Sequence, residues 1–459
     1  MIHNQAILYI LLPLIGALAV VGLYSPFWGL IVFVIIHYIQ PAELVPSLAP
    51  LRPELVYGVL LLGSVVLHSN ATPARKPSNN ILGGAVFLVV VAACSVPFSV
   101  WKGDALSHTI ILVKLVTLLF LLGRVIDTSD RLRRMLWVII ALLGWFSATS
   151  LISYLQGGFI VRMGIERSVG ITSIGGDPNA LAGLIASLLP FGIAGLRCSR
   201  GFLARLAIFS MLGVALAAVV VTGSRAGMVG LLALTAYYII HARHRIALLV
   251  CSLILAAAVW SAMPAQYQQR YLTTVEYAEG NQLDASNQLR IQIWKAGWKM
   301  FLDYPVLGVG AGQFPTAYGS LKYSGVAHGP WMQPHSLFIQ VASELGLVGL
   351  IAFGYFVIQI VTSNRALLRL PQENMSEGNR EVAIACEGML VVALAVSCFG
   401  HTFYSQYWYL AGGLIAANRK LMETRFESEA AIPSADRLEE SDEQFEDVNA
   451  IFERGRVQE

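Results

Sequence analysis

Charged residues are scarce in this chain, and their scarcity excludes several classes of protein. Only 13% of the 459 residues are Asp, Glu, Lys or Arg, against about 25% in an ordinary soluble domain. Such a chain has too little polar surface to dissolve as a globule. The formal net charge is only +3, and no tract of Lys and Arg interleaved with aromatic residues occurs, so a nucleic-acid partner is excluded as well.

The chain also lacks the cysteine patterns of metal sites and disulfide frameworks. It has five cysteines and no Cys-x-x-Cys spacing, and all five fall in apolar runs or in one basic connection. We therefore expect neither a structural zinc ion nor disulfides. The N-terminal residues MIHNQ lack the basic region and cleavage site of a signal peptide, so we expect the first apolar run to be retained.

Long apolar runs dominate what is present, since 56% of the residues are hydrophobic. Several runs reach the roughly 18 to 20 residues that cross a bilayer, and they are continuous rather than alternating, which favours helices over a closed barrel. We predict an all-α integral membrane protein with about 12 or 13 transmembrane helices. The predicted spans are 6–24, 27–39, 55–68, 81–100, 105–123, 135–155, 179–196, 206–222, 226–241, 246–263, 336–361, 382–399 and 403–417.

Arginines separate the connections between spans into two sets. The connections rich in arginine contain Arg124, Arg131, Arg133, Arg134, Arg197, Arg200, Arg205, Arg243, Arg245, Arg365 and Arg369. By the positive-inside rule this side faces the cytoplasm. Residues 156–178, 222–226 and 264–334 are then expected on the opposite face. Thirteen spans would put the N-terminus outside, whereas twelve, with the first two runs as one kinked unit, would put both termini inside; the sequence leaves both open.

The chain is predicted to have two parts. Residues 1–422 form a polytopic membrane domain, which includes a periplasmic loop at 264–334 that caps the bundle. This loop is too long for a bare connection and contains several tryptophans, so we expect it to be ordered and to contain short helices. Residues 423–459 hold twelve acidic and four basic residues, which predicts a disordered cytoplasmic tail.

One helix is predicted within the cap. Ser286 or Asn287 would cap its start, and it would run to about Phe301. Trp294 and Trp298 then share one face with Phe301, as expected for an amphipathic helix at a membrane interface.

His335 is the sharpest feature of the sequence, because it stands where the predicted span 336–361 begins on the outer side. Along a straight helix, Gly346 and Gly349 would return to the face of His335, while Glu344 would lie opposite. The two glycines would then form a stripe on which a neighbouring helix packs closely. For Glu344, we favour a structural pairing role over a catalytic one. The plain alternative for His335 is an interfacial histidine at a helix start.

The spacing of these residues resembles a known signature. His335-Ser336, nine residues and then Gly346-Leu347-Val348-Gly349 match the His-Ser/Asn and Gly-x-x-Gly pattern of the bacterial O-antigen ligase family and its polymerase relatives. Three further stretches support the likeness: Thr222-Gly223-Ser224-Arg225-Ala226-Gly227, Gly175-Gly176-Asp177-Pro178-Asn179 and Arg290-x-x-x-Trp294. The resemblance covers roughly residues 167–360.

The resemblance implies a fold similar to multispan membrane glycosyltransferases and a defined activity. This is the transfer of an oligo- or polysaccharide from undecaprenyl diphosphate to a hydroxyl of lipid A-core or of a growing glycan, at the periplasmic face of the inner membrane. Arg225 and Arg290 would hold the donor diphosphate, and His335 would assist the acceptor hydroxyl. Arg162 and Arg167 would extend the electropositive, substrate-binding surface. The partners would be this donor, the acceptor and membrane lipids, with no metal and no cofactor.

Physical arguments support two of these assignments independently. Arg225 stands on the side where the positive-inside rule depletes arginine. Arg290 would lie in the first turn of its helix, where free N–H groups and a guanidinium together suit a diphosphate. The alternatives are a headgroup anchor for Arg225 and an ordinary surface residue for Arg290. For Asp177 we favour a helix cap over a catalytic carboxylate.

Two other functions remain as alternatives. The motifs do not separate a ligase or polymerase from a protein O-oligosaccharyltransferase. A transporter would need paired ionisable residues near the bilayer midplane and an internal repeat; Lys114 and Glu344 look isolated in the sequence, so transport is the weaker hypothesis.

Overall fold

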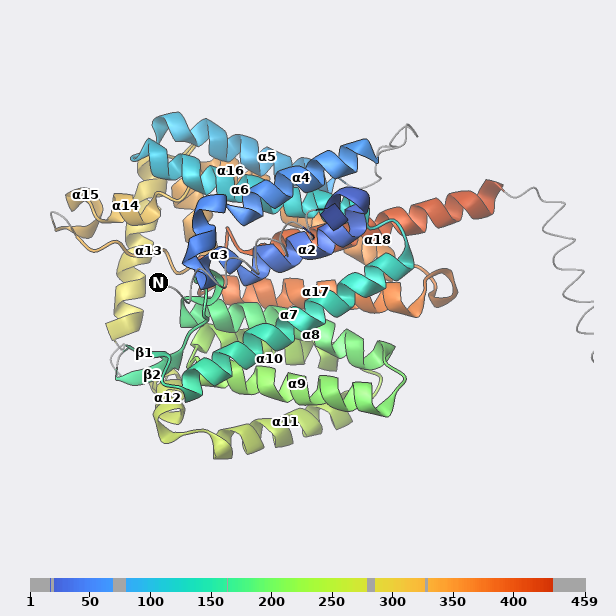
Figure 1. The fold of residues 1–459 in the computed structure, drawn as a ribbon. Helices are drawn as coiled ribbons and strands as arrows, with labels where there is room; N and C mark the ends of the chain where they lie inside the picture. Colours follow the sequence, from blue (N-terminus) through green and yellow to red (C-terminus); the bar gives the residue numbers. More distant parts are fainter. Residues whose placement is uncertain are drawn as a thin grey trace, which may run out of the picture.

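Helices make up nearly all the regular structure in the computed structural model, which describes residues 17, 20–68, 80–162, 164–278, 285–326 and 329–431. Most run side by side in one bundle (Figure 1). The bundle helices are α2 (Pro26–Ile39), α4 (Pro53–Leu67), α5 (Ile81–Ser95), α6 (Lys102–Val125), α7 (Ser129–Leu155), α8 (Pro178–Cys198), α9 (Phe202–Val221), α10 (Arg225–His241), α11 (Arg245–Ala262), α16 (Leu337–Leu368), α17 (Glu377–Ser397) and α18 (Gln406–Ala431). The predicted all-α membrane fold is confirmed.

The predicted spans agree with these helices from the second span onward. Each of them coincides with a bundle helix, and the first, 6–24, lies mostly outside the described residues. Eight described helices are long and apolar enough to cross a membrane, and α2 is a shorter apolar helix. The total of 12 or 13 spans stays a prediction.

The centre of the bundle is α8. In its most apolar window 78% of the residues are buried inside the protein, whereas none of the corresponding residues of α11 is. Small residues explain the central place of α8, since Gly183 packs against Val396 and Gly192 against Leu212. In a membrane such close backbone approach replaces the hydrophobic effect as the source of helix association. α11 therefore lies at the edge of the bundle.

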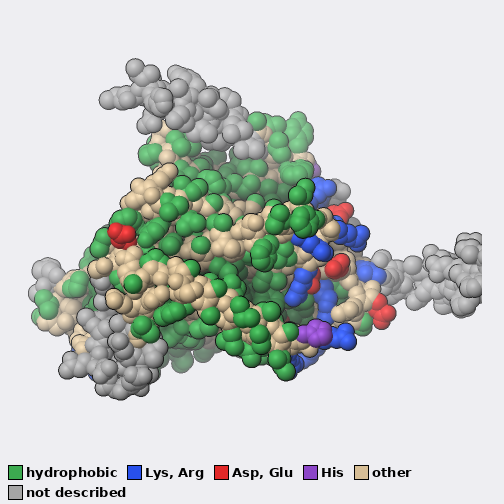
Figure 2. Space-filling view, turned by 90° about the horizontal axis from the view of Figure 1, so that it is seen from below, with side chains coloured by type: hydrophobic (Ala, Val, Ile, Leu, Met, Phe, Trp, Pro, Cys, Tyr) green, Lys and Arg blue, Asp and Glu red, His purple; other side chains and the backbone are tan. Residues whose placement is uncertain are grey.

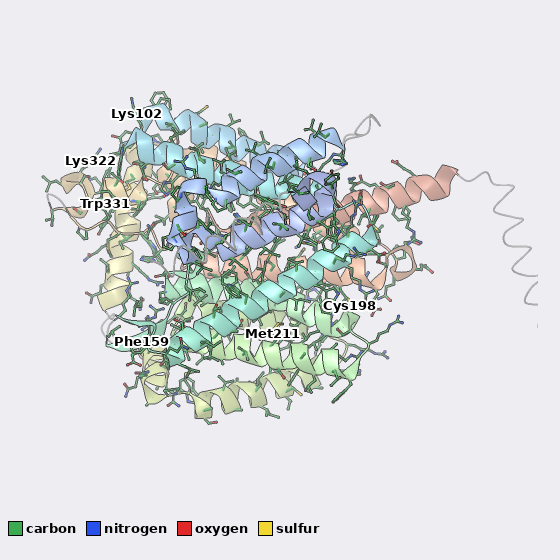
Figure 3. All side chains as sticks on the ribbon, viewed as in Figure 1. Lys102, Phe159, Cys198, Met211, Lys322 and Trp331 are labelled. Atoms are coloured by element: carbon green, nitrogen blue, oxygen red, sulfur yellow. The ribbon has the colours of Figure 1, made fainter. Side chains whose placement is uncertain are left out.

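The two ends of the bundle differ. One end holds the hairpin of β1 (Phe159–Arg162) and β2 (Ile165–Ser168) together with α12 (Ala265–Ala278), α13 (Ala285–Asp303), α14 (Phe314–Tyr318) and α15 (Leu321–Ser324) (Figure 1). Phe159, Lys322 and Trp331 lie at this end, and Cys198 lies toward the other (Figure 3). Lys and Arg gather at that other end (Figure 2). The short segments α3 (Pro41–Leu44), η1 (Pro46–Leu51), η2 (Val96–Phe98), η3 (Ser173–Gly175) and η4 (Gln372–Asn374) complete the chain.

Helix α13 lies across the end of the bundle (Figure 1), and its buried side consists of Ile293, Ala296 and Met300. Trp298 is 53% exposed and lies tilted against Phe301, with ring centroids 5.2 Å apart. Trp294 is partly buried against the core of the cap. That this helix lies at a membrane interface stays a prediction.

The tail begins later than predicted. α18 continues to Ala431, so residues 423–431, predicted to be disordered, are helical. Residues 432–459 lie outside the described part of the chain.

Helix α16 is interrupted at Gly346, where φ is 66° and ψ is −158°. The prediction of a straight helix with a glycine stripe is therefore wrong. A Cβ at Gly346 would meet the backbone of Val306, and one at Gly349 would meet Leu345 of the same helix. Gly346 thus admits a loop of the cap, whereas Gly349 lies against a residue of its own helix, and the two do not form the expected stripe for a neighbouring helix.

The loop at 304–312 satisfies the backbone groups that the interruption exposes. Leu347 and Val348 donate to the carbonyls of Pro305 and Val306 over 2.7 and 3.3 Å. In return, the carbonyl of Ser343 accepts from Val309 over 2.8 Å. An unsatisfied amide inside a bilayer is costly, so this pairing is what permits a broken helix at that depth.

Candidate active site

His335 lies between the cap and the first turn of α16. Its φ of 49° is unusual for a residue other than glycine, so it is outside the helix that begins at Leu337. The carbonyl of the preceding residue, Pro334, accepts a hydrogen bond of 3.0 Å from the indole Nε1 of Trp294 on α13. This bond fixes the backbone next to the imidazole of His335. It also gives Trp294 a structural role within the Arg290-x-x-x-Trp294 motif.

A second histidine faces the first. The ring of His401, in the connection between α17 and α18, lies edge to face with that of His335 at a centroid distance of 5.7 Å. Its Nδ1 atom is buried and has no hydrogen-bond partner among the described residues. Sequence reasoning missed His401, although it lies in a short connection that the predicted topology places outside.

Helix α16 holds the connection that carries His401. The backbone N–H of Phe403 donates to Gln340 Oε1 over 3.2 Å, and the hydroxyl of Tyr404 donates to Glu344 Oε2 over 3.0 Å. Glu344 is 1% exposed and also accepts from the N–H of Gly312 over 2.8 Å. Glu344 thus joins α16, the cap loop and the His401 connection, which is the structural pairing role that we favoured.

A small pocket lies below the two histidines. Its lining includes Asp177, Asn179, Ala226, His335 and His401, from four different parts of the chain, and its volume is about 60 Å³. Such a space admits a hydroxyl group or a few waters and is far smaller than a sugar ring with its substituents.

The turn before α10 is held by two arginines. Arg167 Nε donates to the carbonyl of Thr222 over 2.7 Å, and Arg270 Nε donates to that of Gly223 over 2.7 Å. Arg167 is only 2% exposed, and its Nη2 also donates to Asn179 Oδ1 over 2.9 Å. Arg167, expected on the substrate-binding surface, is thus buried and positions the turn. Arg270, on α12, was not singled out in the sequence.

Arg225 follows this turn as the first residue of α10. Ser224 caps the helix by accepting from the N–H of Gly227 over 3.1 Å. The guanidinium of Arg225 reaches α12, where its Nε donates to the carbonyl of Arg270 over 3.3 Å. The turn therefore directs Arg225 toward the cap, on the same side of the bundle as Arg167 and Arg270.

The remaining predicted arginines lie on the same end of the bundle. Arg162 forms an exposed ion pair with Asp177 at 3.6 Å. Asp177 also caps α8 by accepting from the N–H groups of Asn179 and Ala180 over 2.8 and 3.2 Å, which confirms the predicted cap. Arg290, in the second turn of α13, is close enough to His335 to affect its protonation. The charges of Arg162 and Arg290 thus act on His335, whereas Arg225 lies against Arg270 on α12. That these residues form one catalytic site stays a prediction.

Burial and positive charge govern the ionisation of this site. Burial lowers the pKa of His335 to about 4, and the positive charges of Arg290 and Arg162 act in the same direction. Burial likewise lowers the pKa of His401, against the opposing effect of Asp177. His335 is therefore neutral at neutral pH. Burial lowers the pKa of Arg167 to about 10, so this arginine stays protonated.

Lys114 is not isolated, contrary to the sequence interpretation. Its Nζ atom forms an ion pair of 2.8 Å with Glu54 Oε2, and His37 Nδ1 lies 2.9 Å from Glu54 Oε1. The three residues join α2, α4 and α6. No group of three His, Cys, Asp or Glu residues in the described ranges is arranged to hold a metal ion.

Comparison with known families agrees with the position of these residues. The family model described as O-antigen ligase matches residues 210–354, a stretch that contains Arg225, Arg290, His335 and the interrupted part of α16. No curated protein matches the chain. The match confirms the resemblance found in the motifs: residues 210–354 are similar to the O-antigen ligase family.

Proposed function

We propose that this protein transfers an oligo- or polysaccharide from undecaprenyl diphosphate to an acceptor hydroxyl at the periplasmic face of the bacterial inner membrane. The family match supports glycan transfer in polysaccharide biosynthesis. The donor, the acceptor class and the side of the membrane are our inference from the site. The observation that supports it most is the position of His335, neutral and beside a small pocket, near the positive charges of Arg162 in the hairpin and Arg290 on α13.

The reaction assigns a different task to each group. The acceptor oxygen attacks the anomeric carbon, the bond from that carbon to the diphosphate oxygen breaks, and the diphosphate leaves with the electron pair. Arg225 and Arg290 stabilise the charge that develops on the diphosphate, and such prearranged electrostatics is usually the largest catalytic contribution. A single displacement of this kind inverts the anomeric centre.

His335 receives the acceptor proton. A neutral imidazole accepts a hydrogen bond from the acceptor hydroxyl and orients it. With a pKa of about 4 it is a weak base in the empty site. The donor diphosphate brings negative charge beside it, and a nearby negative charge raises the pKa of a histidine. Donor binding therefore raises the basicity of His335 when the proton has to be accepted. Before the donor binds, the low pKa keeps His335 from being protonated by solvent.

The test is transfer by purified full-length protein with a lipid-linked glycan donor. We expect His335→Ala to be made and inserted at wild-type levels, to retain donor binding and to lose transfer by roughly 10²- to 10⁴-fold. His244→Ala, at an exposed histidine that precedes α11, is the matched control and should be unchanged. Transfer by His335→Ala close to the wild-type rate would return His335 to the role of an interfacial residue.

A deletion strain separates the members of this class of enzyme. Complete loss of long-chain surface glycan from its lipid acceptor indicates a ligase, whereas a single repeat left on the acceptor indicates a polymerase. Unchanged surface glycan together with loss of glycan from secreted or pilus proteins indicates a protein O-oligosaccharyltransferase, the second candidate. Accumulation of donor on the cytoplasmic side only would support transport and contradict the proposal.

A further inference from the structure

A second pocket lies at the basic end of the bundle, away from the site of His335. It is formed by the ends of α8, α10 and α16 and the beginnings of α11 and α17, and its volume is about 440 Å³. Pockets of roughly 300 to 1,000 Å³ are the size that small ligands occupy. The pocket below His335, at about 60 Å³, is much smaller.

The pocket lining has more positively charged than negatively charged side chains. Four arginines line it: Arg197, Arg365, Arg369 and Arg380. Arg197 is paired with Glu381 at 3.2 Å. The other three form no hydrogen bond or ion pair through their guanidinium groups with the residues that the structure describes.

The acidic residue of the lining is already engaged. Glu387 Oε2 accepts a hydrogen bond of 2.8 Å from the hydroxyl of Tyr237. Moreover, the Nη1 atom of Arg380 is buried without a hydrogen-bond partner in the described part of the chain. A buried guanidinium nitrogen in this state requires an acceptor, and phosphate oxygens match guanidinium geometry well.

The surroundings of the pocket favour a lipid over a soluble anion. Leu248, Leu368 and Ile384 line it beside the arginines. Leu248 belongs to α11, whose outer surface is apolar and exposed, as Ile246 at 79% and Leu253 at 60% illustrate. A molecule with a phosphate headgroup and acyl chains would satisfy the arginines and cover this surface together, whereas a free anion would satisfy only the former.

We propose that this basic pocket binds the phosphate headgroup of an anionic phospholipid, with its acyl chains along α10 and α11. Headgroups of anionic lipids are bound by basic pockets between transmembrane helices on the cytoplasmic side. The arginine asymmetry predicts that side for this end. The site is independent of glycan transfer, so it stands or fails separately from the proposed function.

The experiment is a lipid titration of the full-length protein in neutral detergent, followed by its melting temperature. The probes are phosphatidylglycerol, phosphatidylcholine with the same acyl chains, and inorganic phosphate. We expect phosphatidylglycerol to raise the melting temperature more than phosphatidylcholine does, and phosphate to have little effect. An equal effect of the two lipids would overturn the proposal, as would phosphate acting as strongly as phosphatidylglycerol.

Two double variants locate the effect. Each arginine near an anionic headgroup contributes about 1 kcal/mol, so replacing one should weaken lipid binding about fivefold. Arg365→Gln with Arg369→Gln, both exposed residues, should therefore lower the apparent affinity for phosphatidylglycerol by more than tenfold. Arg133→Gln with Arg200→Gln removes the same charge from exposed positions outside the pocket and should change it little. Equal losses in both variants, or none in the first, would contradict a site in this pocket.

A third variant tests the cavity without changing charge. Leu248→Trp, at the edge of the bundle, fills part of the pocket and should also weaken the response to phosphatidylglycerol. If the arginine variants are less stable than the wild type before lipid is added, the Leu248→Trp variant provides the decisive test. A response to phosphatidylglycerol as large as that of the wild type would contradict the proposal.

Discussion

His335 and His401 meet edge to face at 5.7 Å, although they are 66 positions apart in the chain. Both have a pKa below the ordinary value because of burial. Neither ring is therefore charged at neutral pH, and the positive charge of the site comes from its arginines. A neutral pair can accept protons from an acceptor hydroxyl while the arginines hold an anion.

The pH dependence of transfer should report the ionisation of His335. Transfer requires the neutral ring. At donor concentrations well below KM the pKa of the free protein governs the rate, so we expect transfer to be lost as the pH falls toward about 4. Removing the positive charge of Arg290 raises the pKa of His335, so Arg290→Gln should move this acidic limb to higher pH. Asp177→Asn removes a negative charge and should move it to lower pH. Rate profiles for the three proteins check these directions, and identical limbs would show that His335 does not control the profile.

Stability should follow the same ionisation. The unfolded chain has a histidine pKa of about 6.5, above that of folded His335. The unfolded state therefore takes up the proton first, and the free energy of unfolding should fall as the pH drops from about 6.5 to about 4. His335→Gln, which cannot titrate, should reduce this slope in melting experiments. A steeper slope in the variant would contradict the depressed pKa.

Lysine substitutions distinguish a diphosphate clamp from a headgroup anchor. Lysine keeps the charge of Arg225 and Arg290 but loses the planar pair of donors that can engage two phosphate oxygens. We expect Arg225→Lys and Arg290→Lys to retain insertion and abundance, to bind the donor more weakly and to lose most transfer. Active lysine variants, combined with misinserted alanine variants, would instead identify anchors. Transfer and protein level, measured together for all four variants, separate the two cases.

The break in α16 predicts a strong effect of a single methyl group. Gly346 has a φ of 66° and its missing Cβ would meet the backbone of Val306. Strain of this backbone type alone costs about 1 to 3 kcal/mol, and the clash adds to it. Gly346→Ala should therefore lower the melting temperature and the yield of folded protein. Gly354→Ala, in the same helix with open space at its Cβ, should be tolerated; equal effects of the two changes would refute this account of the break.

Cysteine labelling tests the assignment of the two ends. In a background without the five native cysteines, Ser320→Cys in the cap should react with an impermeant reagent added from the periplasm, and Ser129→Cys at the start of α7 should not. Both serines are exposed. The reverse pattern would invert the topology and with it the proposed mechanism.

Most of the fold could be predicted from the sequence because hydropathy, arginine asymmetry and helix caps are local signals. Asp177 is an example, since Asp followed by Pro favours a helix start without any contact to distant parts of the chain. The role of Gly346 could not be predicted, because a glycine in an apolar run reads equally well as a packing stripe or as a break. The choice depends on the loop at 304–312, whose carbonyls replace the missing helical acceptors.

The candidate site was predicted only where local motifs mark it, as they do at Arg225, Arg290 and His335. The burial of Arg167 was missed, because it depends on contact with the turn at Thr222, which is far away in the sequence. His401 has no motif around it. Its place in an outer connection was the available signal, and the alignment with His335 depends on Gln340 and Glu344 reaching across from α16.

The break at Gly346 also separates the site from the lipid around the protein. Membranes differ in thickness, and a long helix responds by changing its tilt. An unbroken α16 would pass each such change directly to His335. In this protein the segment from Leu337 to Leu345 is fastened to the cap and to the His401 connection. The segment beyond Gly346 packs on the bundle along one side and exposes Leu347, Ile351 and Ile358 along the other. We therefore expect a change of tilt beyond Gly346 to reach the two histidines less directly than it would along an unbroken helix.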